Sequence, residues 1–276
     1  MNETNIYLDG ADLNDVKILS GNSEIKGFTS NPSLMSKSGI TNYDEFIKKF
    51  LSLSNSKPVS FEVVSDDFEN MEREALKINS YADNIYVKIP ITNSKGEYSI
   101  ELIKRLLKQK LKINITAVLA NSQIEKIVNN LNSDDDIILS YFAGRVADTG
   151  IDPVPVMVDL KKTINDKGLL KTKILWASPR EVFNVYQANM IGVDIITVTK
   201  SLIDKLNLKN KYLEKYSLET VQMFLNDAIQ KAGIKFYAAR NEAAAPMMAE
   251  AYSKAKNSIW AVCVTAGPGA TNALPG

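Results

Sequence analysis

The chain contains the segment Asn84-Ile85-Tyr86-Val87-Lys88-Ile89-Pro90, an apolar run that holds one charged side chain. Its β-branched and aromatic residues predict a buried strand. Lysine is seldom fully buried without a partner or a purpose. Burial disfavours the ammonium form, and the neutral amine is a nucleophile that attacks carbonyl groups. The alternative is a lysine at a strand end that extends its ammonium group to water.

Further strands and helices alternate on both sides of this segment. The expected strands are Asn5–Asp9, Ile25–Thr29, Pro58–Val64, Asn84–Ile89, Lys112–Thr116, Asp136–Phe142, Thr172–Ala177 and Val193–Val198. The amphipathic stretches that predict helices between them include Asp67–Tyr81, Ser99–Lys110, Ser122–Leu131 and Arg180–Met190. Parallel strands need helical crossovers, so this order predicts an α/β fold with a closed (β/α)8 TIM barrel over residues 1–232. A doubly wound open sheet is the alternative, although no glycine-rich dinucleotide turn or P-loop follows any strand.

The predicted strands end in side chains that can do chemistry. In a barrel of this kind, active-site residues lie at the carboxyl ends of the strands. The residues at or just after these ends are Asp9, Thr29, Asn31, Glu62, Lys88, Asn114, Thr116, Phe142, Arg145, Ser178, Arg180 and Thr197. Their coincidence at one end of the barrel predicts the active site there.

Several of these residues also have a purely structural interpretation. Asp9 suits a turn or a cap, the Asn31-Pro32 pair is typical of a turn, and Glu62 suits a solvated strand exit. Ser178-Pro179-Arg180 resembles a helix start with proline at its first position. A pairing of Arg145 with Asp148 is a further alternative.

The composition narrows the chemistry. The chain has no histidine, which removes the usual parts of zinc hydrolases, metal-dependent aldolases and Ser-His nucleophile pairs, so no metal site is expected. A net charge of +1 gives no reason to expect nucleic-acid or membrane-surface binding. No secretory signal or membrane-spanning run is visible, and the single Cys263 suits a reducing cytoplasm.

The last part of the chain continues the α/β pattern. A helix is expected over 217–232, with Ser217 as its N-cap, and another over 242–255. Short apolar runs at 235–239 and 260–266 predict strands.

Six motifs, in the same order along the chain, resemble the transaldolase family, which includes small members similar to fructose-6-phosphate aldolase. They are Leu8-Asp9-Gly10-Ala11-Asp12, Gly27-Phe28-Thr29-Ser30-Asn31-Pro32-Ser33, Val87-Lys88-Ile89-Pro90, Asn114-Ile115-Thr116-Ala117-Val118, Phe142-Ala143-Gly144-Arg145 and Ala177-Ser178-Pro179-Arg180. The resemblance spans about residues 5–232. It implies transfer of a dihydroxyacetone unit between sugar phosphates in the pentose phosphate pathway, without a cofactor in the barrel.

The resemblance also implies roles for the candidate residues. Lys88 matches the Schiff-base lysine, Asp9 the general acid–base, Glu62 the carboxylate that orients a catalytic water, and Thr116 the residue that holds this water. Substrate contacts are implied for Thr29, Asn31, Asn114, Phe142, Arg145, Ser178, Arg180 and Thr197, with Arg145, Ser178 and Arg180 at the phosphate. The expected partners are phosphorylated sugars and further copies of the chain.

Two positions favour a transaldolase over a simple aldolase. Fructose-6-phosphate aldolases of this group tend to carry Gln at the position of Glu62 and Tyr at that of Phe142. An aldolase that releases dihydroxyacetone stays the first alternative. A non-catalytic or bifunctional fusion partner of a thiamine-diphosphate enzyme is the alternative of another class.

Residues 233–276 resemble a different family. The runs Phe236–Ala245 and Val264–Ala273 are similar to the start of the pyrimidine-binding domain of thiamine-diphosphate enzymes of the acetolactate-synthase type. The resemblance implies that Glu242 would activate that cofactor if a complete domain existed. This segment is too short for an independent core. We therefore expect a truncated α/β appendage that does not bind thiamine diphosphate.

Overall fold

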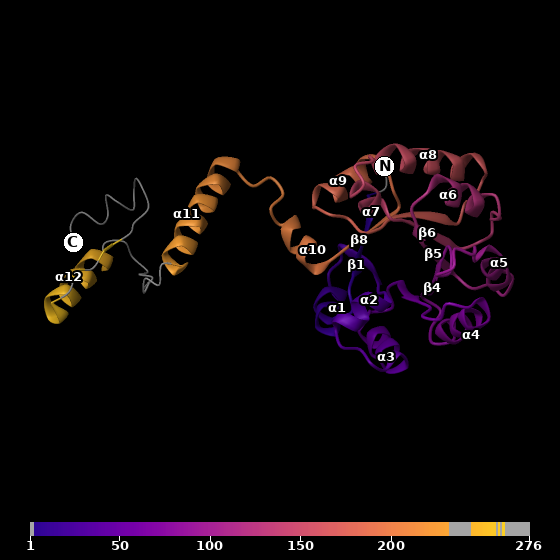
Figure 1. The fold of residues 1–276 in the computed structure, drawn as a ribbon, viewed down its shortest axis with the longest axis horizontal. Coiled ribbons are helices and arrows are strands. Elements are labelled where there is room, and N and C mark those ends of the chain that lie inside the picture. Colours follow the sequence, from indigo (N-terminus) through magenta and orange to yellow (C-terminus); the bar gives the residue numbers. More distant parts are fainter. Residues whose placement is uncertain (1–2, 232–243, 258, 260, 263–276) are drawn as a thin grey trace. The chain divides into compact units, whose positions relative to one another are not determined.

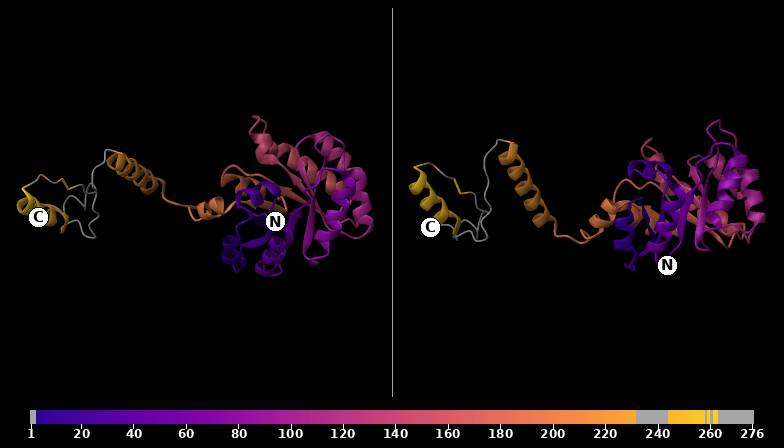
Figure 2. Two further views of the ribbon diagram at one scale, coloured as in Figure 1. Left: turned by 60° about the horizontal axis from the view of Figure 1, so that its bottom comes forward. Right: turned by 90° about the horizontal axis from the view of Figure 1, so that it is seen from below.

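Eight parallel strands form a closed barrel. Each strand pairs with the next one in the chain, and the last pairs with the first. The strands are β1 (Asn5–Asp9), β2 (Ile25–Thr29), β3 (Val59–Glu62), β4 (Ile85–Pro90), β5 (Ile113–Val118), β6 (Ile137–Tyr141), β7 (Thr172–Trp176) and β8 (Ile195–Val198). Helices surround the barrel in the computed structural model (Figure 1), and two turned views show the same arrangement (Figure 2). The predicted TIM barrel is confirmed, and each predicted strand lies within two residues of an observed one.

The structure describes residues 3–231, 244–257, 259 and 261–262. The chain divides into two compact units, residues 1–209 and 210–276. The barrel lies in the first unit. The boundary at residue 232, drawn from the sequence, stays a prediction.

Most of the hydrophobic core lies between the barrel wall and the helices. Strand residues alternate between the two faces of a sheet, so every second residue points outward. Outward rings of β2 and β3 pack edge to face with rings of α3 (Tyr43–Leu53), with centroids 5.3–6.2 Å apart: Phe28, Phe61, Phe46 and Phe50. The core therefore fixes the positions of the strands from outside.

The interior of the barrel contains a separate apolar cluster. Its buried members are Tyr7, Tyr86, Ile138, Leu175, Ala177 and Ile195. The ring of Tyr7 occupies the space beside Gly27, where an added Cβ would lie 2.5 Å from ring atoms. On β1, β4, β6 and β8 the next inward residue along the strand is polar, namely Asp9, Lys88, Ser140 and Thr197. This change of character places the polar site at the carboxyl end of the barrel.

The helices of the first unit follow the strands in turn. They are α1 (Leu13–Ser20), α2 (Pro32–Lys37), α3 (Tyr43–Leu53), α4 (Phe68–Asn79), α5 (Ile100–Lys108), α6 (Asn121–Val128), α7 (Ala143–Ala147), α8 (Pro153–Asp166), α9 (Phe183–Met190) and α10 (Lys200–Leu206). Side chains of Asp12, Asn42 and Asp67 accept hydrogen bonds from the first backbone N–H groups of their helices. These caps explain why the helices begin where they do.

The second unit contains α11 (Leu213–Lys231) and α12 (Ala244–Lys256). The prediction that Ser217 caps a helix was wrong, because α11 begins four residues earlier and Ser217 lies inside it. A helix expected over 242–255 is confirmed as α12. The predicted strand at 235–239 and most of the one at 260–266 lie outside the described residues. Among the described residues, no helix is long and apolar enough to cross a membrane.

Candidate active site

Lys88 lies on β4 with its side chain inside the barrel and only 6% of its surface exposed. Its Nζ is 3.0 Å from Oε2 of Glu62 on β3, and it donates a hydrogen bond of 3.2 Å to the carbonyl oxygen of Ser30. Glu62 and Lys88 are paired in the strand register, so both side chains point to the same face. A lysine that extends to water is therefore excluded. The amine has a carboxylate beside it that can accept its proton.

Asp9 ends β1 next to this pair. Its Oδ1 accepts a hydrogen bond of 2.7 Å from the hydroxyl of Thr29, its register partner on β2. Burial raises the pKa of the Asp9 carboxyl above its ordinary value, while Lys88 and the Thr29 hydroxyl act in the opposite direction and Glu62 adds to the rise. Asp9 is thus neither a helix cap nor a turn residue. A carboxyl with a raised pKa suits proton transfer closer to neutral pH.

Two residues of β5, Asn114 and Thr116, also belong to the site around Lys88. Asn114 is fully buried and is the register partner of Lys88. The hydroxyl of Thr116 is also buried and has no hydrogen-bond partner among the described residues. Buried hydroxyls usually have a partner. The Thr116 hydroxyl is therefore available to form a hydrogen bond with a molecule bound inside the site.

The sequence did not reveal the residues that orient Asn114. The hydroxyl of Ser140 donates to its Oδ1 at 2.7 Å, and its Nδ2 donates to the hydroxyl of Ser60 at 3.1 Å. These serines lie on β6 and β3, two residues before Phe142 and Glu62. The alternation of strand side chains was the available signal, since it puts both serines on the inner face.

Tyr43 is a second residue that the sequence did not reveal. Its hydroxyl donates a 2.7 Å hydrogen bond to the main-chain oxygen of Glu62. Its ring packs edge to face on Phe61, at 6.5 Å between centroids. Tyr43 on α3 therefore holds the end of β3, and with it Glu62, from outside the barrel.

Two arginines lie on the connections that follow β6 and β7. Arg145 is on α7, and its guanidinium lies 5.5 Å from the ring centre of Phe142. Arg180 lies in the loop after β7 and forms a two-point ion pair with Asp148, with Nε–Oδ1 at 2.9 Å and Nη2–Oδ2 at 2.5 Å. The suggested pairing of Arg145 with Asp148 was wrong. The carboxylate faces the neighbouring loop rather than its own helix.

Ser178 lies in the same loop with φ of +61°, a left-handed conformation that is uncommon outside glycine. Helix α9 begins at Phe183, and its N-cap residue Val182 makes no side-chain cap. The interpretation of Ser178-Pro179-Arg180 as a helix start is therefore wrong. The side chains of Ser178 and Arg180 in this strained loop therefore do not cap α9.

The remaining predicted residues are less closely tied to the lysine. The Oδ1 of Asn31 accepts from the backbone N–H of Leu34 at 3.0 Å and caps α2, so this residue begins a helix, whereas the structural interpretation placed it in a turn. Thr197 on β8 is buried, and its hydroxyl bonds weakly to the carbonyl of Trp176 at 3.4 Å. Glu242 lies outside the described residues.

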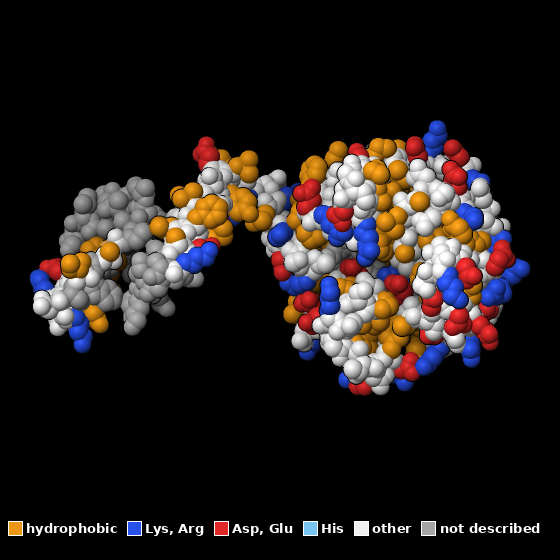
Figure 3. Space-filling view, in the orientation of Figure 1, with side chains coloured by type: hydrophobic (Ala, Val, Ile, Leu, Met, Phe, Trp, Pro, Cys, Tyr) orange, Lys and Arg blue, Asp and Glu red, His pale blue; other side chains and the backbone are white. Residues whose placement is uncertain are grey.

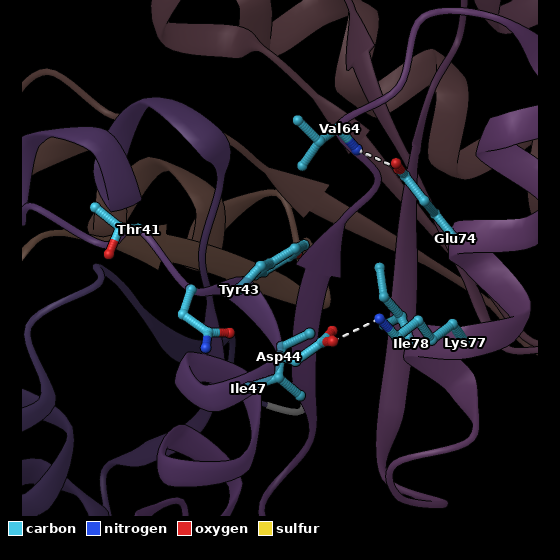
Figure 4. Close-up of a pocket in the computed structure, with 9 residues that line it drawn as sticks. Thr41, Tyr43, Asp44, Ile47, Val64, Glu74, Lys77 and Ile78 are labelled. Carbon is cyan, nitrogen blue, oxygen red and sulfur yellow. Dashed lines mark hydrogen bonds and ion pairs between the residues drawn. The ribbon is translucent and has the colours of Figure 1, made fainter.

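A cavity of about 530 Å³ lies outside the barrel, between α3 and α4 (Figure 4). Its charged side chains are paired with one another or with backbone, as Asp44 with Lys77 at 2.5 Å and Glu74 with the Val64 N–H at 2.7 Å. None of the predicted site residues lines it. The reactive groups thus lie inside the barrel rather than in this cavity.

The described residues contain no group of three Asp, Glu or Cys side chains arranged to hold a metal ion. What they do bring together is an amine, two carboxylates and a buried hydroxyl. These groups can form an imine with a carbonyl compound and move protons around it.

The comparisons with known proteins agree with this chemistry. The family model described as Transaldolase/Fructose-6-phosphate aldolase matches residues 6–258. A "Probable transaldolase" of Thermoplasma volcanium is 34% identical over 224 residues, which cover 80% of this chain and 94% of the relative. Proteins of the same name from Carboxydothermus hydrogenoformans and Hyphomonas neptunium are 32% and 33% identical and are covered to 96% and 98%.

The family match extends into the segment that was predicted to belong to a thiamine-diphosphate enzyme. It ends at residue 258, and nothing in the comparisons supports a thiamine-diphosphate segment. The prediction of a foreign segment from residue 233 onward thus has no support. With a match over most of its length and relatives that it covers almost end to end, the chain belongs to the transaldolase/fructose-6-phosphate aldolase family.

Proposed function

We propose that the chain is a Schiff-base transaldolase that moves a dihydroxyacetone unit from a ketose phosphate to an aldose phosphate. The observation that carries this proposal is the buried amine of Lys88, 3.0 Å from the carboxylate of Glu62 at the carboxyl end of the barrel. The family works through a Schiff base and needs no cofactor.

The amine of Lys88 adds to the ketose carbonyl, and the carbonyl oxygen leaves as water. The resulting iminium draws electrons from the C3–C4 bond when a base removes the proton of the C4 hydroxyl. That bond breaks, an aldose phosphate leaves, and an enamine remains on Lys88. The enamine carbon then attacks the aldehyde of the second sugar phosphate, and water releases the new ketose and the free amine.

The two carboxylates divide the proton transfers. Asp9 carries out the transfer at the C4 hydroxyl, because its raised pKa lets it both accept and return a proton. Glu62 accepts the proton of the Lys88 ammonium and orients the water that Thr116 binds. The unpartnered Thr116 hydroxyl supports this assignment.

The substrate is held at both ends. The dihydroxyacetone part is surrounded by Thr29, Asn31, Asn114, Phe142 and Thr197. Two serines orient Asn114. Arg145, Ser178 and Arg180 bind the phosphate, for which the planar guanidinium group offers paired N–H donors.

Transfer is expected to need an acceptor. With fructose 6-phosphate alone, we expect only slow release of dihydroxyacetone; a four-carbon aldose phosphate should speed consumption of the ketose by at least about tenfold. A coupled assay for the released three-carbon aldose phosphate measures both rates. Equal rates with and without acceptor would favour the alternative, an aldolase. A matched variant, Phe142→Tyr with the aldolase-type residue, should shift the enzyme toward release.

We also propose that copies of the chain associate through α11. Apolar side chains, coloured orange, lie along this helix in Figure 3. Its exposed apolar residues include Leu213, Leu218, Val221, Met223, Phe224 and Leu225. A helix that is apolar on several sides is normally buried against another surface. Light scattering should therefore report a mass that is a multiple of 30.6 kDa. A monomer would contradict this, and Phe224→Lys is expected to reduce the mass.

A further inference from the structure

The loop between β7 and α9 carries Ser178 and Arg180, yet it has no regular structure of its own. Asn184 anchors its far end, since the side-chain oxygen accepts from the backbone N–H of Arg180 at 2.8 Å and of Glu181 at 3.2 Å. These bonds hold the main chain. They leave the long side chain of Arg180 to be placed by other contacts.

The neighbouring helix α7 provides those contacts. The N–H of Gly144 donates to the carbonyl of Ala177 at 3.3 Å. A Cβ at position 144 would lie 1.6 Å from the carbonyl oxygen of Ser178 and 2.6 Å from its carbon. Only glycine lets α7 and the loop approach this closely. Helix α7 also carries Arg145, so this contact sets the relative positions of the two arginines.

Asp148, the C-cap residue of α7, forms the second contact. Its two oxygens accept from Nε and Nη2 of Arg180, which fixes the plane of the guanidinium. Arginine has five N–H donors. The edge formed by Nη1 and Nη2 keeps free donors, and no other side chain among the described residues bonds to it. Arg145 likewise has no carboxylate within ion-pair distance in the described part of the chain.

We propose that Asp148 is a positioning residue that presents the free edge of Arg180, beside Arg145, to the phosphate of the substrate. Gly144 supports the same geometry by allowing α7 to lie against the loop. This inference rests on the proposed function, because it takes the two arginines to be the phosphate site. It makes the enzyme's preference for phosphorylated sugars depend on a carboxylate that never touches them.

The test compares phosphorylated and unphosphorylated ketoses. Asp148→Asn keeps the size of the side chain but removes its charge, and we expect KM for fructose 6-phosphate to rise about tenfold with kcat little changed. The inhibition constant of inorganic phosphate should rise by a similar factor. Cleavage of fructose itself should not change. The matched control is Glu72→Gln, which alters a similar exposed pair between Glu72 and Arg105, away from the site.

A double mutant separates positioning from general weakening. If Asp148 acts through Arg180, then Asp148→Asn adds nothing to the KM of Arg180→Ala. Gly144→Ala is expected to raise KM in the same way, although the clash at Ser178 can also prevent folding, so Asp148→Asn is the decisive variant. An unchanged or lowered KM in that variant would overturn the inference.

Failure of the inference differs from failure of the proposed function. If Arg180→Ala raises KM for fructose 6-phosphate and Asp148→Asn does not, then the phosphate site stands and the role of Asp148 is wrong. If Arg180→Ala leaves KM unchanged, both the phosphate site and the inference are wrong. If borohydride traps no substrate adduct on Lys88 in the wild-type protein, the proposed function is contradicted, but the role of Asp148 is not tested.

Discussion

Replacement of Lys88 by alanine is expected to lower transfer by about four to six orders of magnitude, as removal of a covalent nucleophile does in other enzymes. Borohydride reduces an imine to a stable amine. Wild-type protein treated with fructose 6-phosphate and borohydride should therefore gain a three-carbon adduct, and peptide mapping should place it on Lys88. The alanine variant should show no adduct.

The controls address two complications. Alanine at position 88 leaves Glu62 partly buried without its cation, which destabilises the protein. Lys88→Met together with Glu62→Gln removes this charge imbalance, so a folded but inactive protein can be examined by circular dichroism. Lys57 is the matched control lysine, because its Nζ also donates to a backbone carbonyl, that of Asn22 at 2.8 Å. Lys57→Ala should keep the adduct, whereas an adduct that persists in Lys88→Ala would refute the mechanism.

Asp9→Asn is expected to make the enzyme about 10²- to 10⁴-fold slower and, at neutral pH, more stable. Asparagine cannot exchange the C4 hydroxyl proton, yet its side-chain oxygen still accepts the hydrogen bond from Thr29. The gain in stability follows from the raised pKa of Asp9 in the folded state. A charged carboxylate there costs more free energy than it does in the unfolded chain.

The pH dependence of this effect has a defined sign. Below the ordinary Asp pKa, both states keep the proton, and Asp9 has no ionisation penalty. As the pH rises from that value through the raised folded-state pKa, the wild type loses stability relative to Asp9→Asn, by about 1.4 kcal/mol for each pH unit that separates the folded-state pKa from the ordinary one. Urea unfolding at about pH 4 and at pH 7 measures the difference. If the difference in unfolding free energy between the wild type and Asp9→Asn does not increase from about pH 4 to pH 7, the raised pKa of Asp9 is contradicted.

Asp66 is the control with the opposite sign. The Ser94 hydroxyl and N–H donate to its carboxylate at 2.7 Å, and these bonds lower the pKa of Asp66. Asp66→Asn should therefore be less stable than the wild type above the ordinary Asp pKa, and the difference should disappear as the pH falls through the lowered value. Both variants remove one carboxylate, so only their environments distinguish them.

Much of this molecule was predictable from the sequence because its local signals agree with its fold. Apolar runs, amphipathic stretches and the order of the segments predicted the barrel, and strand ends predicted where the polar groups lie. The helix start at Ser217 failed because a serine near an acidic residue resembles a cap even inside a longer helix. Ser60 and Ser140 were missed because alternation shows that they face the barrel interior but not which side chain they contact there.

The sequence by itself determined the barrel and suggested which side chains could react, because both depend on periodicity and on residue type. The tertiary structure alone decided which groups meet. Lys88 contacts Glu62 because the parallel pairing of β3 with β4 sets these two residues opposite each other. Asp148 pairs with Arg180 rather than Arg145 because Gly144 brings the loop after β7 against α7. Such pairings depend on register and side-chain direction between segments distant in the chain, which no local pattern records.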